Sequence, residues 1–159
     1  MHPRAEEFAA EARERYGFEP DVREFPEGTE TAADAAAAIG CDVARIASSI
    51  AVRVGDELVV VVTSGTNRVD LDAVAQLRGR EPGSAAMADP GAVRETLGWS
   101  IGGVPPFCHE TPVPTYLDGT LLAFDTVWAA AGTPRATFPI APDRLRELAD
   151  ATPADVAAD

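Results

Sequence analysis

The segment Leu58–Thr63, with the sequence LVVVVT, limits the possible folds of this chain more than any other feature. It is β-branched almost throughout, which is typical of a strand buried on both faces. A second strand is predicted at Ile46–Val54, and Gly55-Asp56 predicts a tight turn that joins the two into a hairpin. Such a strand must be covered by other parts of the chain on both sides.

Helices and further strands are interspersed with this hairpin. Apolar spacing, capping residues and terminal glycines predict helices at 3–16, 32–39, 71–77, 90–97 and 142–149. Strand-like runs occur at 21–25, 114–117, 121–124, 127–130 and 136–140. We therefore expect a mixed α/β fold in which helices pack on a mixed sheet.

The length and hydropathy of the chain predict one domain. A chain of 159 residues is close to the usual size of one domain, so we expect a single domain over 1–159. The longest strongly apolar run, Leu58–Val62, is far shorter than the ~18 residues that span a bilayer. The amino-terminal segment alternates charged residues with alanine and has no apolar signal-peptide core, which predicts a cytoplasmic location.

The charge is strongly acidic. The formal net charge is −13, and all 13 basic residues are arginine, with no lysine. An acidic surface repels phosphate backbones at low salt, which argues against binding of nucleic acid through a basic patch. Acidity, abundant alanine and the absence of lysine also suggest a halophilic or high-GC source. At 1 M salt the Debye length is about 3 Å, so a nucleic-acid substrate is not excluded.

The residues that usually hold metals are sparse. The two cysteines, Cys41 and Cys108, are too few and too far apart for a disulfide framework or a zinc knuckle. No histidine–carboxylate cluster has metal-ligand spacing, and no nucleotide-binding glycine loop is present. We expect no metal and no cofactor.

The segment Gly102–His109, GGVPPFCH, is the strongest local signal for a functional site. Its two glycines allow close approach of the main chain to a ligand, and its two prolines stiffen the loop so that its amides keep one direction. Fixed amides of this kind stabilise the oxyanion that develops during ester hydrolysis. A rigid structural turn explains the same residues, and composition alone does not decide between these two interpretations.

The loop and the strands that follow it resemble those of the YbaK/ProX aminoacyl-tRNA deacylases, which include the editing domain inserted in bacterial prolyl-tRNA synthetases. The similarity covers Gly102–His109, Asp118 and Val127–Gly132, and the helix, hairpin and "VDL" helix start of the amino-terminal half. It extends over about residues 29–150, which we take as the core of the domain. The family implies a barrel-like mixed sheet surrounded by helices, with a cleft beside the loop.

The resemblance also implies a reaction and a set of residues. Members of the family hydrolyse the ester between a wrongly attached amino acid and the terminal ribose of tRNA. The chemistry relies on bound water and substrate groups more than on a protein nucleophile. By position, the resemblance assigns catalysis to Ser48, Gly102 and His109, and substrate binding to Gly103, Val104, Pro105, Pro106, Phe107, Asp118, Ala130 and Gly132.

The sequence departs from the family at Ser48. Members commonly have a lysine in a "KSL"-like triplet at the start of the first hairpin strand, and the aligned triplet here is Ser48-Ser49-Ile50. A hydroxyl forms hydrogen bonds but brings no positive charge to the substrate. The departure puts catalytic competence, or the usual specificity, in question.

Three further residues have two interpretations each. Cys108 stands where the family often has glycine, and its neighbour His109 invites a thiolate–imidazole pair, yet neighbours on a strand point to opposite faces. His109 either orients water or ribose at the edge of the pocket or anchors the loop. Asp118, before Gly119, is either a turn residue or a residue of the cleft.

Two functions therefore compete, and a third is weaker. The first is a free-standing trans-editing hydrolase of mischarged aminoacyl-tRNA, chiefly on tRNA(Pro). The second is a binding module of the same fold that recognises an aminoacyl-adenosine end or a small molecule without turnover. The third is a cysteine hydrolase built on Cys108. The residues leave open whether the protein is a monomer or a homo-oligomer.

Overall fold

The predicted hairpin is the centre of the fold. In the computed structural model, which describes residues 1–29 and 31–158, β2 (Ile46–Val54) pairs antiparallel with β3 (Glu57–Ser64), from Ala47 opposite Ser64 to Val54 opposite Glu57. The side chains of Val59 to Val62 are all 0% exposed. Burial of β3 on both faces is therefore confirmed.

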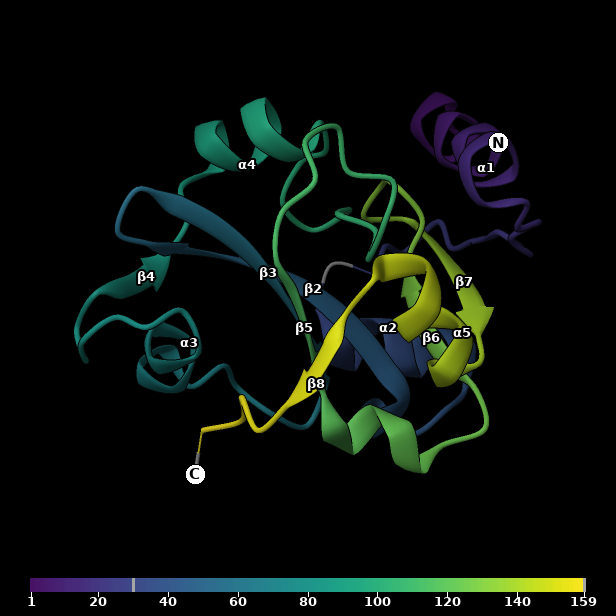
Figure 1. Ribbon diagram of the computed structural model, residues 1–159. Coiled ribbons are helices and arrows are strands. Elements are labelled where there is room, and N and C mark those ends of the chain that lie inside the picture. The colour runs from purple at the N-terminus through teal and green to yellow at the C-terminus, as the bar shows by residue number, and fades with distance from the viewer. Residues whose placement is uncertain (30, 159) are drawn as a thin grey trace.

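Around the hairpin lies an eight-stranded mixed sheet (Figure 1). Its order is β1 (Arg23–Glu24), β7 (Ala136–Ile140), β6 (Val127–Ala130), β2, β3, β5 (Thr115–Asp118) and β8 (Thr152–Ala154), with β4 (Ala85–Met87) also paired to β2. The pairs β2–β6, β3–β5 and β5–β8 are parallel, and the others are antiparallel. This architecture confirms the expected mixed fold.

Five α-helices surround the sheet: α1 (Pro3–Tyr16), α2 (Ala32–Ile39), α3 (Leu71–Leu77), α4 (Pro90–Leu97) and α5 (Pro142–Ala149). Thr31, Asp70 and Asp89 cap the starts of α2, α3 and α4, because each side chain accepts a hydrogen bond from the amide three residues on. The predicted helix bounds are thus confirmed. None of the described helices is long and apolar enough to cross a membrane.

The core has a different composition on each face of the sheet. On one face Phe8 of α1 packs against Phe107 and Phe138, with ring centroids 5.7 and 5.0 Å away. On the other face Val52, Val54, Val59 and Val61 pack against Val74 of α3 and against Tyr116. Aromatic packing on the first face holds the segment after Gly102 against α1 and the sheet.

Three details differ from the sequence-based expectations. The strand predicted at 121–124 is wrong, because the chain forms the 3₁₀ helix η2 (Gly119–Ala123), whose start is capped by Asp118 through the amide of Thr120 at 3.0 Å. The strands β4 and β8 were not predicted, since three residues are too short for a periodic signal. A second 3₁₀ turn, η1 (Val43–Arg45), leads into β2.

Candidate functional site

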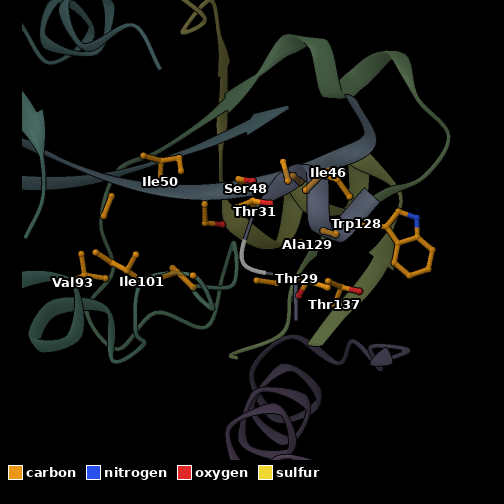
Figure 2. Close-up of a pocket in the computed structure, with 18 of the residues that line it drawn as sticks. Thr29, Thr31, Ile46, Ser48, Ile50, Val93, Ile101, Trp128, Ala129 and Thr137 are labelled. Atoms are coloured by element: carbon orange, nitrogen blue, oxygen red, sulfur yellow. The ribbon is translucent and has the colours of Figure 1, made fainter. Parts of the chain in front are cut away.

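A gap in the sheet along one edge of β2 defines the candidate site. On that edge β6 pairs with Ile46 and Ala47, and β4 pairs with β2 only from Val52 onward. Between the two, a cavity of about 210 Å³ opens beside Ser48–Ala51 (Figure 2). The two strands that border the gap come from distant parts of the chain, β4 from 85–87 and β6 from 127–130.

Figure 2 shows Ile50, Val93 and Ile101 toward the left of the cavity, and Thr29 and Thr137 toward the right, beside Ile46, Trp128 and Ala129. The aliphatic wall consists of Ile50, Met87, Val93 and Ile101. The hydroxyl wall consists of Thr29, Thr31, Ser48 and Thr137. Among the described residues that line the cavity, none has a charged side chain. The described part of this lining therefore offers a ligand neutral hydrogen-bonding groups and apolar contacts.

Two buried hydroxyls at this cavity lack a hydrogen-bond partner among the described residues. They are Ser49 Oγ and Thr137 Oγ1, and Thr137 is only 4% exposed. An unsatisfied buried hydroxyl costs about 1–3 kcal/mol, so a partner is normally present. Their position indicates that water or a ligand supplies the missing hydrogen bonds.

The glycine-proline loop forms the side of the cavity opposite Ser48. Gly102 has a φ of 94°, a left-handed conformation that favours glycine, and both Gly102 and Val104 line the cavity. A Cβ on Gly103 would lie 2.7 Å from the Cα of Thr133, so only glycine fits there. The amide of Gly103 donates to the Ser100 carbonyl at 3.0 Å. The loop amides that remain next to the cavity are therefore those of Gly102 and Val104.

The structure brings together four of the residues assigned by resemblance and places the others behind them. Ser48, Gly102, Val104 and Ala130 all line the cavity. The residues outside its lining are Gly103, Pro105, Pro106, Phe107, His109, Asp118 and Gly132. Pro105, Pro106 and Phe107 are buried and hold the loop in place. At Gly132 a Cβ would meet a ring carbon of Trp99 at 2.7 Å, so glycine allows that ring to pack closely.

His109 lies on the far side of the loop from the cavity. Its side chain is buried, and Nε2 lies 2.8 Å from the carbonyl oxygen of Pro105, to which it donates as the neutral tautomer. Burial lowers the pKa of His109 below its ordinary value of 6.5. This placement favours the loop-anchoring interpretation over contact with ribose or water in the cavity.

Cys108 lines a second cavity, of about 340 Å³, together with His109, Arg15 and Arg78. Burial raises the pKa of the Cys108 thiol to about 12, so the thiol carries its proton at neutral pH. Its φ of 66° is left-handed, which explains why the family often has glycine there. A thiol of this kind is not an activated nucleophile, and the cysteine-hydrolase interpretation finds no support in this geometry.

Asp118 joins three segments behind the site. One carboxylate oxygen accepts from the amide of Ser64 at 3.1 Å and from the side-chain amide of Asn67 at 2.8 Å, and the other accepts from Thr120. Burial alone would raise the pKa of Asp118, but these hydrogen bonds outweigh burial and lower it. The carboxylate stays ionised and fixes the end of β3.

Sequence reasoning missed most of the cavity lining, including every hydroxyl-bearing residue of the lining other than Ser48: Thr29, Thr31, Ser49 and Thr137. Thr31 precedes the helix predicted at 32–39. Its role as a helix cap has a local sequence pattern, whereas its position in the cavity lining has none. Thr137 lies opposite Ala130 in the β6–β7 pair, which is a long-range register that no single segment shows. No group of His, Cys, Asp and Glu in the described part of the chain is arranged to hold a metal ion.

The fold and the cavity define a class of protein: a mixed-sheet domain with a neutral pocket between a strand edge and a glycine-proline loop. A family model described as the aminoacyl-tRNA editing domain matches residues 26–148. The chain belongs to this family, and the expected resemblance is confirmed.

Individual relatives agree with this assignment. The chain is 35% identical over 137 residues to the uncharacterized protein YwhH of Bacillus subtilis (strain 168), covering 84% of each. It is 38% identical, with a TM-score of 0.92, to a proposed trans-editing enzyme for prolyl tRNA synthetase, covering 100% of this chain and 99% of that one. A scaffold for epitope backbone grafting by computational design is 39% identical with a TM-score of 0.91, at the same coverage.

Proposed function

We propose that this protein is a trans-editing hydrolase, which cleaves the ester of mischarged aminoacyl-tRNA, chiefly on tRNA(Pro), in the cytoplasm. Membership of the editing-domain family supports the reaction. The relative described as a proposed trans-editing enzyme for prolyl tRNA synthetase supports the choice of tRNA, because it matches over nearly all of both chains. The proposal treats residues 1–159 as one domain with its core at about 29–150.

The observation that carries this proposal is the neutral cavity between Ser48 and the Gly102–Val104 loop. An aminoacyl ester bound there would have its carbonyl carbon between the β2 edge and the amides of Gly102 and Val104. Attack by water on the carbonyl carbon would form a tetrahedral oxyanion that those amides stabilise. Collapse would break the ester bond and transfer a proton to the ribose oxygen, releasing the free amino acid and deacylated tRNA.

The residues assigned by resemblance would then fall into two groups. Ser48, Gly102 and Val104 would contact the reacting ester, and Ala130 would line the pocket beside the substrate. Gly103, Pro105, Pro106, Phe107 and Gly132 would fix the loop, His109 would anchor it through Pro105, and Asp118 would hold the end of β3. No resident metal or cofactor is part of the proposed reaction.

The alternative function is a binding module that keeps the pocket without turnover. The observation in its favour is Ser48, since none of the described residues lining the cavity supplies the positive charge that the family lysine would bring. A module of this kind would retain aminoacyl-adenosine ends or a small molecule. It would release no amino acid.

The deciding experiment measures deacylation of a panel of mischarged tRNAs, chiefly tRNA(Pro), in low salt and in molar KCl. We expect cleavage above background, and stronger cleavage at high salt if the net charge of −13 repels tRNA. Absence of cleavage for every member of the panel in both salts would contradict the proposal.

The variant Ser48→Lys separates the two functions. A gain of deacylation in an inactive wild type would identify a disabled pocket, whereas a loss in an active wild type would identify a pocket retuned around the hydroxyl. Ser84→Lys is the matched control, because it adds the same charge outside the residues that line the cavity.

A further inference from the structure

Part of the main chain of β2 faces the cavity and has no hydrogen-bond partner among the described residues. The amide of Gly65 donates to the carbonyl of Ile46 at 2.8 Å, so Ile46 and Gly65 form a hydrogen-bonded pair of the β2–β3 ladder. In an antiparallel ladder, hydrogen-bonded pairs alternate with non-hydrogen-bonded pairs. The peptide groups of Ser48, Ile50 and Val52 therefore also face β3. Those of Ala47, Ser49 and Ala51 face the other edge.

Neighbours occupy only the two ends of this edge. Ala47 lies in the parallel ladder with β6, whose register with β2 ends at Ala129. The carbonyl of Ala51 accepts from the amide of Ala88 at 3.1 Å, next to the first β4 pair. Among the described residues, the Ser49 amide, the Ser49 carbonyl and the Ala51 amide have no hydrogen-bond partner in either ladder. The Ser49 hydroxyl is unpartnered as well.

This edge presents a donor, an acceptor and a second donor in a row along the cavity. Peptide groups withdrawn from bulk solvent are almost always hydrogen-bonded, so this row would pair with water or with a ligand that offers complementary main-chain-like groups. A strand of another protein does not fit, because four residues of strand span only about 13 Å and β6 and β4 close both ends. The space between them admits a single residue.

We infer that the open edge of β2 at Ser49 and Ala51 binds the α-aminoacyl group of the substrate as a one-residue strand. The α-ammonium donates to the Ser49 carbonyl, and the ester carbonyl accepts from the flanking amide of Ser49 or Ala51. A main-chain carbonyl is a hydrogen-bond acceptor, and a hydrogen bond from a charged donor is stronger than one between neutral groups, so the Ser49 carbonyl suits this cation. The inference rests on the proposed function and states how the same site recognises its substrate.

Main-chain recognition has a consequence for specificity. Every α-amino acid presents the same ammonium and carbonyl, so the β2 edge would recognise the class of ester. Side chains would then be sorted by contact with the rest of the cavity, including the aliphatic wall. An acyl group without an α-amine would lose the edge contact whatever its side chain.

The test is binding of hydrolysis-resistant amides of 3′-amino-3′-deoxyadenosine by the whole protein. The tightest binder among the alanyl, seryl and valyl amides is compared with its counterpart that lacks the α-amine. We expect binding about 10- to 100-fold weaker without the amine, which corresponds to one hydrogen bond to a charged group. Equal affinity of the two, or no binding by any of the three amides, would overturn the inference.

Amide chemical shifts locate the contact. On addition of the aminoacyl amide we expect the ¹⁵N–¹H signals of Ser49 and Ala51 to move, while that of Arg53, which faces the same edge but pairs with β4, stays within error. Equal movement of all three would also count against the inference. Deacylation is measured separately, so amine-dependent binding without cleavage refutes the proposed hydrolysis alone, and cleavage without amine dependence refutes this inference alone.

Discussion

Two cavities in the described part of the chain border the same loop yet differ in chemistry. The cavity at the β2 edge is lined by Gly102 and Val104, and none of its described lining residues is charged. The other is lined by Phe107, Cys108 and His109, together with Arg15 and Arg78. The side chains that look most reactive in the sequence therefore lie at the second cavity and not at the one beside β2.

The two halves of the Gly102–His109 loop contribute differently to the candidate site. Its first half offers main chain to the β2 edge, and its second half is buried and anchors the first half. His109 anchors it through Pro105, and Trp99 donates its ring N–H to the Cys108 carbonyl at 2.9 Å. In the proposed reaction, a site without charged described residues would act through its peptide groups and a bound water.

The largest effect is expected from Gly103→Ala, which disturbs the first half of the loop. The new Cβ would meet the main chain of Thr133 at 2.7–2.9 Å, so the loop must shift away from Thr133 and change its position at the cavity. We expect a loss of about 1–3 kcal/mol in the free energy of unfolding and at least a tenfold lower rate of deacylation. Denaturant unfolding and the deacylation assay measure the two effects.

Gly119→Ala is the control for this prediction, because a Cβ there meets nothing within 4 Å and the φ is not left-handed. If both variants behave alike, the close packing of the loop against Thr133 does not determine the site.

A smaller effect is expected from pH, through the anchor in the second half of the loop. Burial lowers the pKa of His109 in the folded state, so the unfolded chain takes up the proton first as pH falls. The stability that depends on neutral His109 is complete above about pH 6.5 and is lost as pH falls through the folded-state pKa. Unfolding curves between pH 7.5 and pH 5 measure this loss.

His109→Gln provides the comparison, because its amide can still donate to Pro105 without titrating. We expect the variant to have a flatter dependence over the same range. A dependence as steep as that of the wild type would show that another group is responsible.

The smallest effect is expected from Cys108→Ala, which tests whether the second cavity takes part in chemistry. The pKa of its thiol is raised to about 12, and its main chain keeps the same left-handed φ after substitution. We expect a change within about 1 kcal/mol in stability and no change in deacylation. Loss of deacylation in a folded variant would instead place the reaction in the second cavity.

Much of the fold could be predicted because its signals are local. The caps Thr31, Asp70 and Asp89 act within one turn of their own helices, and the alternation of the hairpin is carried by contiguous residues. The strand predicted at 121–124 is wrong because the apolar residues of that run do not reveal the 3₁₀ turn that Asp118 caps. Of the site, Ser48 and the glycine-proline loop were predicted, whereas Ser49 and Thr137 were not.

The sequence by itself determined the hairpin, the helix ends and the loop, since these depend on neighbours along the chain. Only the tertiary structure decided which half of the loop faces the cavity, and that Cys108 and His109 face the other one. It alone also decided that β6 stops and β4 starts on either side of Ser49. A gap in a sheet depends on the register at which strands from positions 85–87 and 127–130 pair with β2. The local sequence of β2 does not determine that register.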